Sequence, residues 1–110
     1  RKGDCSTLNI YSNQPRGGVF GWATYAHDCK KQVLYDGVVI AHYTRPGGSV
    51  KNYNEGDTLI HEVGHWFGLF HTFEGRCGNF PDRISDIPAE ASAASGCPVG
   101  RDTCPSPGVD

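Results

Sequence analysis

Residues 61–71 decide the fold and read His-Glu-Val-Gly-His-Trp-Phe-Gly-Leu-Phe-His. His61 and His65 are four positions apart, so in a helix they project from one face with their Cβ atoms about 5–6 Å apart. Two imidazoles at that spacing can bind a single zinc ion, each at about 2.0–2.1 Å. The stretch therefore predicts a helix that carries a metal site, with the pattern His-Glu-x-x-His-x-x-Gly-x-x-His.

The other residues of this stretch complete a candidate catalytic centre. Glu62 follows the first histidine but is rotated by about 100° around the helix axis, so it can reach a metal-bound water without binding the metal. Gly68 allows a left-handed turn out of the helix, which a Cβ would resist, and that turn brings His71 round as a third ligand. Three protein ligands leave a fourth position open for water, as in catalytic zinc sites.

The helix that carries the motif is predicted to begin at Asn54 and to end at Gly68. Asn54 is an N-cap residue type, and Asp57 three positions later can complete a capping box. Glycine is the usual residue just past a helix end. The apolar side chains occupy more than one side of the helix, which predicts that it is largely buried; they are Leu59, Ile60, Val63, Trp66 and Phe67.

Three segments before the helix have the composition of β-strands. Residues 7–11, 19–26 and 37–43 are rich in β-branched and aromatic side chains, whereas residues 27–32 are polar and predict a loop. Gly21 lies inside the second segment, which indicates a bulge or a close backbone approach. From Glu74 onward the sequence shows neither the two-residue period of a β-strand nor the 3.6-residue period of a helix. We therefore expect an α+β fold: a small twisted mixed sheet over a long active-site helix, followed by an irregular C-terminal layer.

Composition narrows the class of protein. The chain has 110 residues, enough for one domain but hardly for two, and its 10 Lys and Arg against 12 Asp and Glu give a net charge of −2. No basic stripe or polybasic cluster marks a nucleic-acid or membrane-surface protein. No apolar run approaches the roughly 20 residues of a membrane-spanning helix. The five cysteines, without a Cys-x-x-Cys pair, favour disulfides and an extracellular location.

Residues 53–69 read Tyr-Asn-x-Gly-x-Thr-Leu-x-His-Glu-Val-Gly-His-Trp-Phe-Gly-Leu and resemble the pappalysin family of metzincin zinc endopeptidases. The match is strongest to the secreted fungal extracellular metalloproteases, and residues 37–40, 46–49, 71–73 and 85–90 also fit. The resemblance implies a secreted zinc endopeptidase that hydrolyses protein or peptide substrates. It implies one Zn²⁺ per chain, bound by His61, His65 and His71, with Glu62 as the general base.

The resemblance also implies how the substrate and the domain are arranged. An extended substrate would pair with the edge strand from Phe20 to Tyr25, with Gly21, Trp22 and Ala23 as its binding residues. For Trp22 and Tyr25, ordinary core or cross-strand packing is the favoured interpretation. Residues 1–110 would be a single partial catalytic domain, truncated at both ends and without the family's Met-turn. Its expected parts are the sheet in 1–50, the active-site helix and third ligand in 54–71, and the irregular segment 72–110.

Further implications of the resemblance concern the cysteines and calcium. Cys77 would pair with Cys104 and Cys5 with Cys29, while the partner of Cys97 would lie beyond Asp110. Relatives can carry calcium after the third histidine. Oxygen ligands for Ca²⁺ could come from three carboxylates, although solvated loop side chains are the favoured interpretation; they are Asp82, Asp86 and Asp102.

Two alternatives to an active enzyme stay open. The chain could be a zinc-binding or partner-binding fragment without turnover, because small displacements of a catalytic site remove orders of magnitude in rate. It could also be a disulfide-stapled secreted binding module in which the motif is vestigial. Bound zinc without cleavage would favour the first alternative, and absence of bound metal would favour the second. In each case we expect a monomer.

Overall fold

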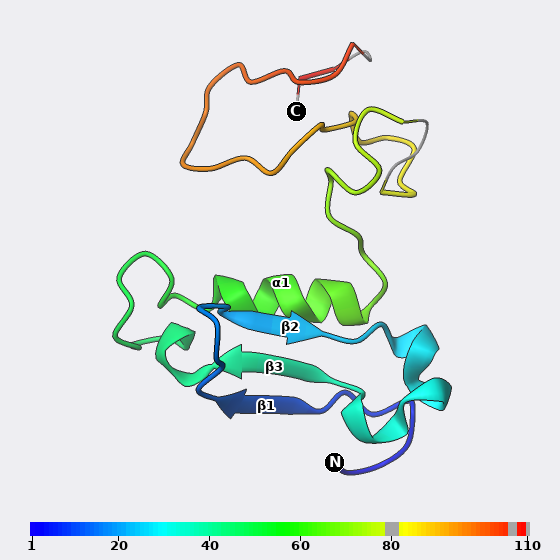
Figure 1. The fold of residues 1–110 in the computed structure, drawn as a ribbon, viewed down its shortest axis with the longest axis vertical. Coiled ribbons are helices and arrows are strands. Elements are labelled where there is room, and N and C mark those ends of the chain that lie inside the picture. Colours follow the sequence, from blue (N-terminus) through cyan, green and yellow to red (C-terminus); the bar gives the residue numbers. More distant parts are fainter. Residues whose placement is uncertain (79–81, 106–107, 110) are drawn as a thin grey trace. The chain divides into compact units, whose positions relative to one another are not determined.

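The computed structural model describes residues 1–78, 82–105 and 108–109 (Figure 1). The chain forms two compact units, Arg1–Leu69 and Phe70–Asp110. Within the described ranges, all regular elements lie in the first unit: strands β1 (Ile10–Asn13), β2 (Gly21–Ala23) and β3 (Val38–Ala41), the 3₁₀ turns η1 (Ala26–Lys31), η2 (Val33–Tyr35) and η3 (His42–Thr44), and helix α1 (Asp57–Trp66).

The three strands form one mixed sheet in the order β1-β3-β2. β1 pairs with β3 in parallel, and β2 pairs with β3 antiparallel, with Trp22 opposite Val39. The sheet is therefore mixed, as predicted, and β2 is one of its edges. β3, at the centre, is the most deeply buried of the three strands, with Val38 and Ala41 at 0% and Ile40 at 6% exposure.

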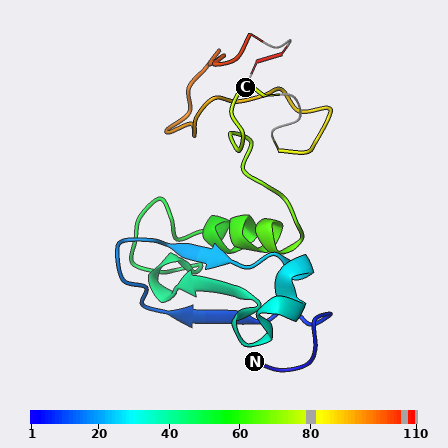
Figure 2. The same cartoon turned by 45° about the vertical axis from the view of Figure 1, so that its right-hand side comes forward.

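Helix α1 contacts both β2 and β3 and lies alongside β2 in both ribbon views (Figures 1 and 2). Its last residue, Trp66, packs with Val38 and Ile40 to form the centre of the core. Partly buried apolar residues surround this centre; they are Leu8, Ala23, Ala26, Leu59 and Val63. One sheet packed against one helix confirms the expected α+β class.

The bounds of the strands differ from the ranges predicted from composition: each strand is shorter, and the first is also shifted along the chain. The first begins at Ile10, not at Thr7, and the second is restricted to Gly21–Ala23. The third ends at Ala41 because the chain then turns into η3, where the Thr44 hydroxyl donates to the Ala41 carbonyl at 2.9 Å. The segment predicted as a loop, 27–32, falls largely within η1. Strand ends follow backbone pairing, which local composition does not determine.

The start of α1 also differs from the prediction. The N-cap is Gly56 in a left-handed conformation with φ +109°, and no side chain caps the helix. Asn54 instead donates from its side chain to the Gly48 carbonyl at 2.8 Å, so it closes the preceding turn. Ile60 and Phe67 were predicted to be buried, but each is 71% exposed. They lie about a quarter turn away from the helix face that packs on the sheet.

The second unit contains no helix or strand among its described residues, in agreement with the irregular layer predicted from composition. Glu90 pairs with Arg101 and accepts a hydrogen bond from the Thr72 hydroxyl. The disulfide Cys77–Cys104 closes this unit.

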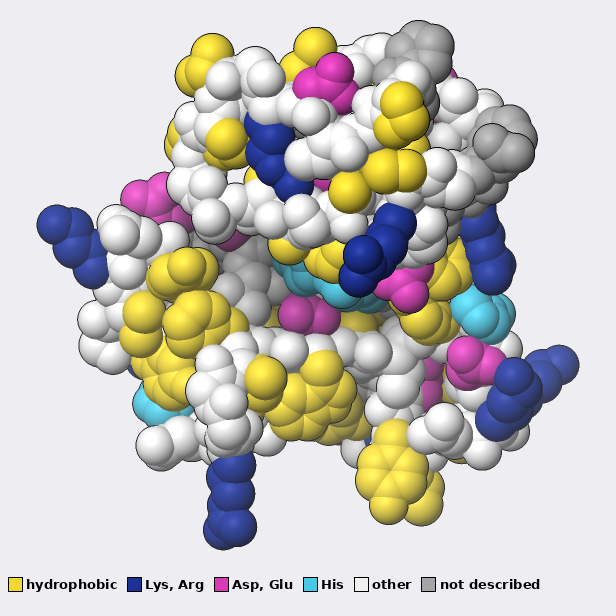
Figure 3. All heavy atoms as spheres, turned by 45° about the horizontal axis from the view of Figure 1, so that its top comes forward, with side chains coloured by type: hydrophobic (Ala, Val, Ile, Leu, Met, Phe, Trp, Pro, Cys, Tyr) yellow, Lys and Arg dark blue, Asp and Glu magenta, His cyan; other side chains and the backbone are white. Residues whose placement is uncertain are grey.

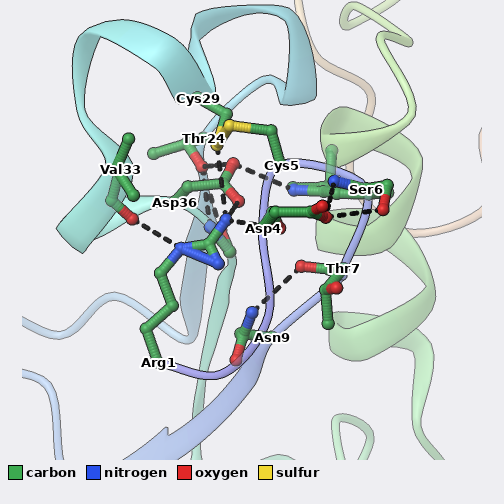
Figure 4. Close-up of a disulfide and its surroundings, with 12 residues drawn as sticks. Arg1, Asp4, Cys5, Ser6, Thr7, Asn9, Thr24, Cys29, Val33 and Asp36 are labelled. Atoms are coloured by element: carbon green, nitrogen blue, oxygen red, sulfur yellow. Dashed lines mark hydrogen bonds and ion pairs between the residues drawn. A yellow bond between two sulfur atoms is a disulfide. The ribbon is translucent and has the colours of Figure 1, made fainter.

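The first unit holds the other disulfide, Cys5–Cys29, shown in Figure 4. Cys97 is exposed and is not part of a disulfide. The two disulfides are the pairs that the family resemblance implied. In the described part of the chain, no helix has both the length and the apolar character needed to cross a bilayer.

Candidate metal centre

Helix α1 presents two of the predicted ligands to one another. The imidazole rings of His61 and His65 lie edge to face, with centroids 4.6 Å apart, and their Nε2 atoms are 3.0 Å apart. Because each ligand nitrogen lies about 2.0–2.1 Å from a zinc ion, two ligands of one ion can be at most about 4 Å apart. The separation of the two Nε2 atoms satisfies that limit.

The end of the helix orients His65. Nδ1 of His65 lies 2.7 Å from the Leu69 carbonyl oxygen, which can only accept, so Nδ1 carries the hydrogen in this bond. The neutral ring then has its lone pair on Nε2, the atom that faces His61. A carbonyl that fixes the tautomer in this way is a common partner of metal-binding histidines.

Gly68 makes this contact possible. Its φ is +100°, and the backbone closes a Schellman motif in which Gly68 N donates to His65 O at 2.8 Å and Leu69 N donates to Gly64 O at 3.0 Å. The left-handed turn ends the helix where the sequence predicted and returns the Leu69 carbonyl to the His65 ring. The role of Leu69 was not predicted, because a backbone carbonyl leaves no signal in composition.

His71 follows this turn. It belongs to the second unit, Phe70–Asp110. The ring of His71 stacks on Phe73 with centroids 4.8 Å apart. Three imidazoles are a suitable donor set for zinc, so the residues fit the metal that the motif predicted.

Glu62 is buried beneath β2. Only 7% of this residue is exposed. A Cβ on Gly21 would lie 2.8 Å from Glu62 Cγ and 3.0 Å from its Oε1, so the close approach predicted at Gly21 is to this carboxylate. Burial raises the pKa of Glu62 above its usual value, and the nearby charges of His61 and His65 oppose that rise. The arrangement holds a desolvated carboxylate beside two imidazoles.

The start of β2 borders a pocket of about 400 Å³ next to Glu62, lined by Val19, Phe20, Gly21, Tyr53, Asp57, Thr58, His61 and Glu62. Of the residues predicted to bind substrate, Gly21 lines this pocket, Trp22 is 45% exposed and Ala23 packs against the core. Figure 3 shows one face of the molecule, where hydrophobic side chains, in yellow, are exposed at the surface.

The carboxylates considered for calcium do not gather into a candidate group within the described ranges. Asp82 is buried and its Oδ1 accepts a hydrogen bond from Ile84 N at 3.0 Å, as in an Asx turn. Asp86 and Asp102 are exposed. The favoured interpretation of solvated side chains thus fits these two residues, whereas Asp82 organises a local turn.

The small mixed sheet, the helix with paired histidines and the buried glutamate match the fold and the motif expected of a metzincin. The family model Peptidase M43, described as pregnancy-associated plasma protein-A, matches residues 14–107, and the chain belongs to this family. The resemblance to pappalysins noted from the sequence is confirmed.

Relatives and solved structures agree with this assignment. The chain is 53% identical to an extracellular metalloprotease of Colletotrichum graminicola and 54% identical to one of Podospora anserina, in each case over 100% of this chain. It spans 41% and 39% of the length of these relatives. Mature mirolysin of Tannerella forsythia, solved in complex with a cleaved peptide, is 32% identical with a TM-score of 0.80, over 94% of this chain and 41% of that one.

Proposed function

We propose that this chain is part of the catalytic domain of a secreted zinc-dependent metalloendopeptidase. In this proposal His61, His65 and His71 bind the metal and Glu62 is the general base. The observation that carries it is the buried Glu62 carboxylate, held beside two imidazoles whose Nε2 atoms face each other at 3.0 Å. The names of the fungal relatives, extracellular metalloproteases, support the extracellular location.

Three imidazole donors with no thiolate leave the coordination sphere open, which is typical of catalytic zinc sites rather than structural ones. Zinc bound there would supply Lewis acidity, which acidifies water and polarises the carbonyl of the scissile peptide bond. The protein's own task is to present Nε2 of His65 in the ligating tautomer. The hydrogen bond from its Nδ1 to the Leu69 carbonyl does this.

Glu62 moves the proton of the reaction. Its carboxylate takes a proton from the attacking water and delivers it to the nitrogen of the leaving amine as the C–N bond breaks. Burial favours this role in two ways. It raises the carboxylate's basicity by desolvation, and it restricts the side chain, because β2 lies close above it at Gly21. A carboxylate fixed in position loses little entropy in the reaction.

The substrate proposal rests on the open edge of β2. Since β2 pairs only with β3 within the described sheet, an extended peptide can add to its outer edge by backbone hydrogen bonds, with Gly21, Trp22 and Ala23 as the binding residues. Such pairing suits protein and peptide substrates of varied sequence. We further propose that residues 1–110 belong to one catalytic domain and act as a monomer.

The proposal is tested with the 110-residue chain, casein as substrate and zinc in the buffer. Glu62→Ala should abolish cleavage while one zinc per chain is retained, and a chelator should abolish cleavage by the unsubstituted chain. Glu55→Ala is the matched control, because Glu55 is exposed and lies outside the metal centre and its pocket. Zinc binding without cleavage would identify a non-catalytic zinc-binding protein, and no zinc binding would refute the ligand assignment.

A further inference from the structure

A second buried carboxylate has no part in the proposed reaction. Asp36 lies between η2 and β3 and has no exposed surface. Three side chains donate hydrogen bonds to it: the guanidinium of Arg1 at 2.8 Å, the indole of Trp66 at 3.2 Å and the hydroxyl of Thr24 at 3.3 Å. Figure 4 shows Arg1 and Thr24 directed at Asp36. One carboxylate thus joins three segments that are distant in the sequence.

Trp66 connects this network to the metal centre. It is the last residue of α1, directly follows His65, and is 6% exposed against Val38 and Ile40. Packing against two aliphatic side chains is non-directional. The hydrogen bond from its Nε1 to Asp36 adds a direction and fixes how the last turn of α1 is rotated against the sheet.

We propose that Asp36 is a positioning residue for the metal centre, and that it acts through Trp66 on the orientation of His65. The inference rests on the proposed function, because it assigns His65 as a ligand. A ligand has to be held within about 0.5 Å of its binding geometry by its supporting residues. The Leu69 carbonyl fixes the His65 ring within the helix end, and Asp36 fixes that helix end against the sheet.

The ion pair with Arg1 holds the Asp36 carboxylate in a fixed position. Arg1 and Asp36 form an ion pair whose side chains are 6% and 0% exposed. Arg1 also donates to the Asp4 carbonyl at 2.9 Å and to the Val33 carbonyl at 2.5 Å. A buried carboxylate that lost its cation would be left uncompensated, which proteins tolerate poorly. The disulfide Cys5–Cys29 ties the segment that carries Arg1 to η1.

The test uses Trp66→Phe, which keeps an aromatic ring in the core but removes the N–H donor. Zn²⁺ affinity is measured by competition with a chromophoric chelator, and Co²⁺ is used as a spectroscopic probe of the ligand arrangement. We expect Zn²⁺ to bind about tenfold more weakly, equivalent to about 1.4 kcal/mol, together with a changed visible spectrum of bound Co²⁺. Tyr35→Phe is the control: Tyr35 precedes Asp36 but is 77% exposed, so neither quantity should change.

A second pair of variants keeps the test decisive if Trp66→Phe does not fold. Arg1→Met removes the charge paired with Asp36 but keeps an apolar stem, and Arg1→Lys restores the charge. Folding of each variant is checked by circular dichroism. We expect Arg1→Met to weaken Zn²⁺ binding and to change the Co²⁺ spectrum, and Arg1→Lys to recover part of both.

Two outcomes would overturn the inference. If every folded variant binds Zn²⁺ within twofold of the unsubstituted chain and gives the same Co²⁺ spectrum, Asp36 has a structural role only. If the unsubstituted chain itself binds no metal, the proposed function fails and the inference fails with it. A loss of folding stability alone would not change the spectrum of Co²⁺ bound to the folded variant.

Discussion

Replacing Gly21 by alanine should displace the carboxylate of Glu62, the proposed general base. The added Cβ would lie 2.8 Å from Glu62 Cγ, 2.9 Å from the Val39 carbonyl oxygen and 3.0 Å from Glu62 Oε1. Carbon atoms in contact are ordinarily about 3.5–4.0 Å apart, so the Glu62 side chain has to move by roughly 1 Å. Val39 belongs to the central strand, which pairs on both sides, so it cannot move away without disturbing the sheet.

These displacements set the expected magnitudes. Overpacking of this kind costs about 1–3 kcal/mol in the free energy of unfolding. A catalytic group displaced by about 1 Å loses on the order of 100-fold in rate. Gly64→Ala is the matched control, because the nearest atom to its Cβ would be Leu69 Cδ1 at an ordinary 3.6 Å. Inside a helix that substitution should stabilise the fold by about 0.5–1 kcal/mol.

The two variants are compared by urea unfolding, followed by tryptophan fluorescence, and by hydrolysis of a peptide substrate. The reasoning would be refuted if Gly21→Ala unfolded within about 0.5 kcal/mol of the unsubstituted protein, the range of ordinary surface substitutions. Unchanged hydrolysis at lowered stability would show that the carboxylate does not need its place beneath β2.

Three other predictions can be checked on the same chain. Without metal, the raised pKa of Glu62 means that the folded state holds the proton more tightly, so the free energy of unfolding should fall as pH rises from about 4.5 through the folded-state pKa. Glu62→Gln should remove that decrease in urea titrations across this range, and a persisting decrease would assign it to another group. Gly68→Ala forces a side chain into φ +100° and should cost about 1–2 kcal/mol, seen as a lower Tm and weaker zinc binding; an unchanged Tm would contradict the role of the turn. Thiol titration of the denatured, unreduced protein should find one thiol, that of Cys97, and a count of three or five would contradict the disulfides.

The motif itself was predictable because short-range geometry determines it. The four-residue spacing of His61 and His65 fixes a shared helix face, and Gly68 marks the left-handed turn through its missing Cβ. The isolated Gly21 similarly indicated that another group approaches the strand, although it did not identify Glu62 as that group.

Tertiary contacts determined what the sequence did not reveal. Asn54 is a residue type that is typical of N-caps. Its side chain instead donates a hydrogen bond to the Gly48 carbonyl, and the helix begins after Gly56. Ile60 and Phe67 are apolar but face away from the sheet, since one helix face alone can pack on it. Arg1 and Trp66 are 35 and 30 positions away from Asp36 in the sequence, and only the fold brings them to it.

The two disulfides have a consequence for survival of the molecule among proteases. Each closes a loop within a single unit, with sequence separations of 24 and 27 residues. A single backbone cut inside either loop would leave both pieces covalently joined, and the cut would become visible in electrophoresis only after reduction. Nicks in the irregular segment between Cys77 and Cys104 could therefore accumulate without releasing a fragment, so that damage and loss of mass become separate events.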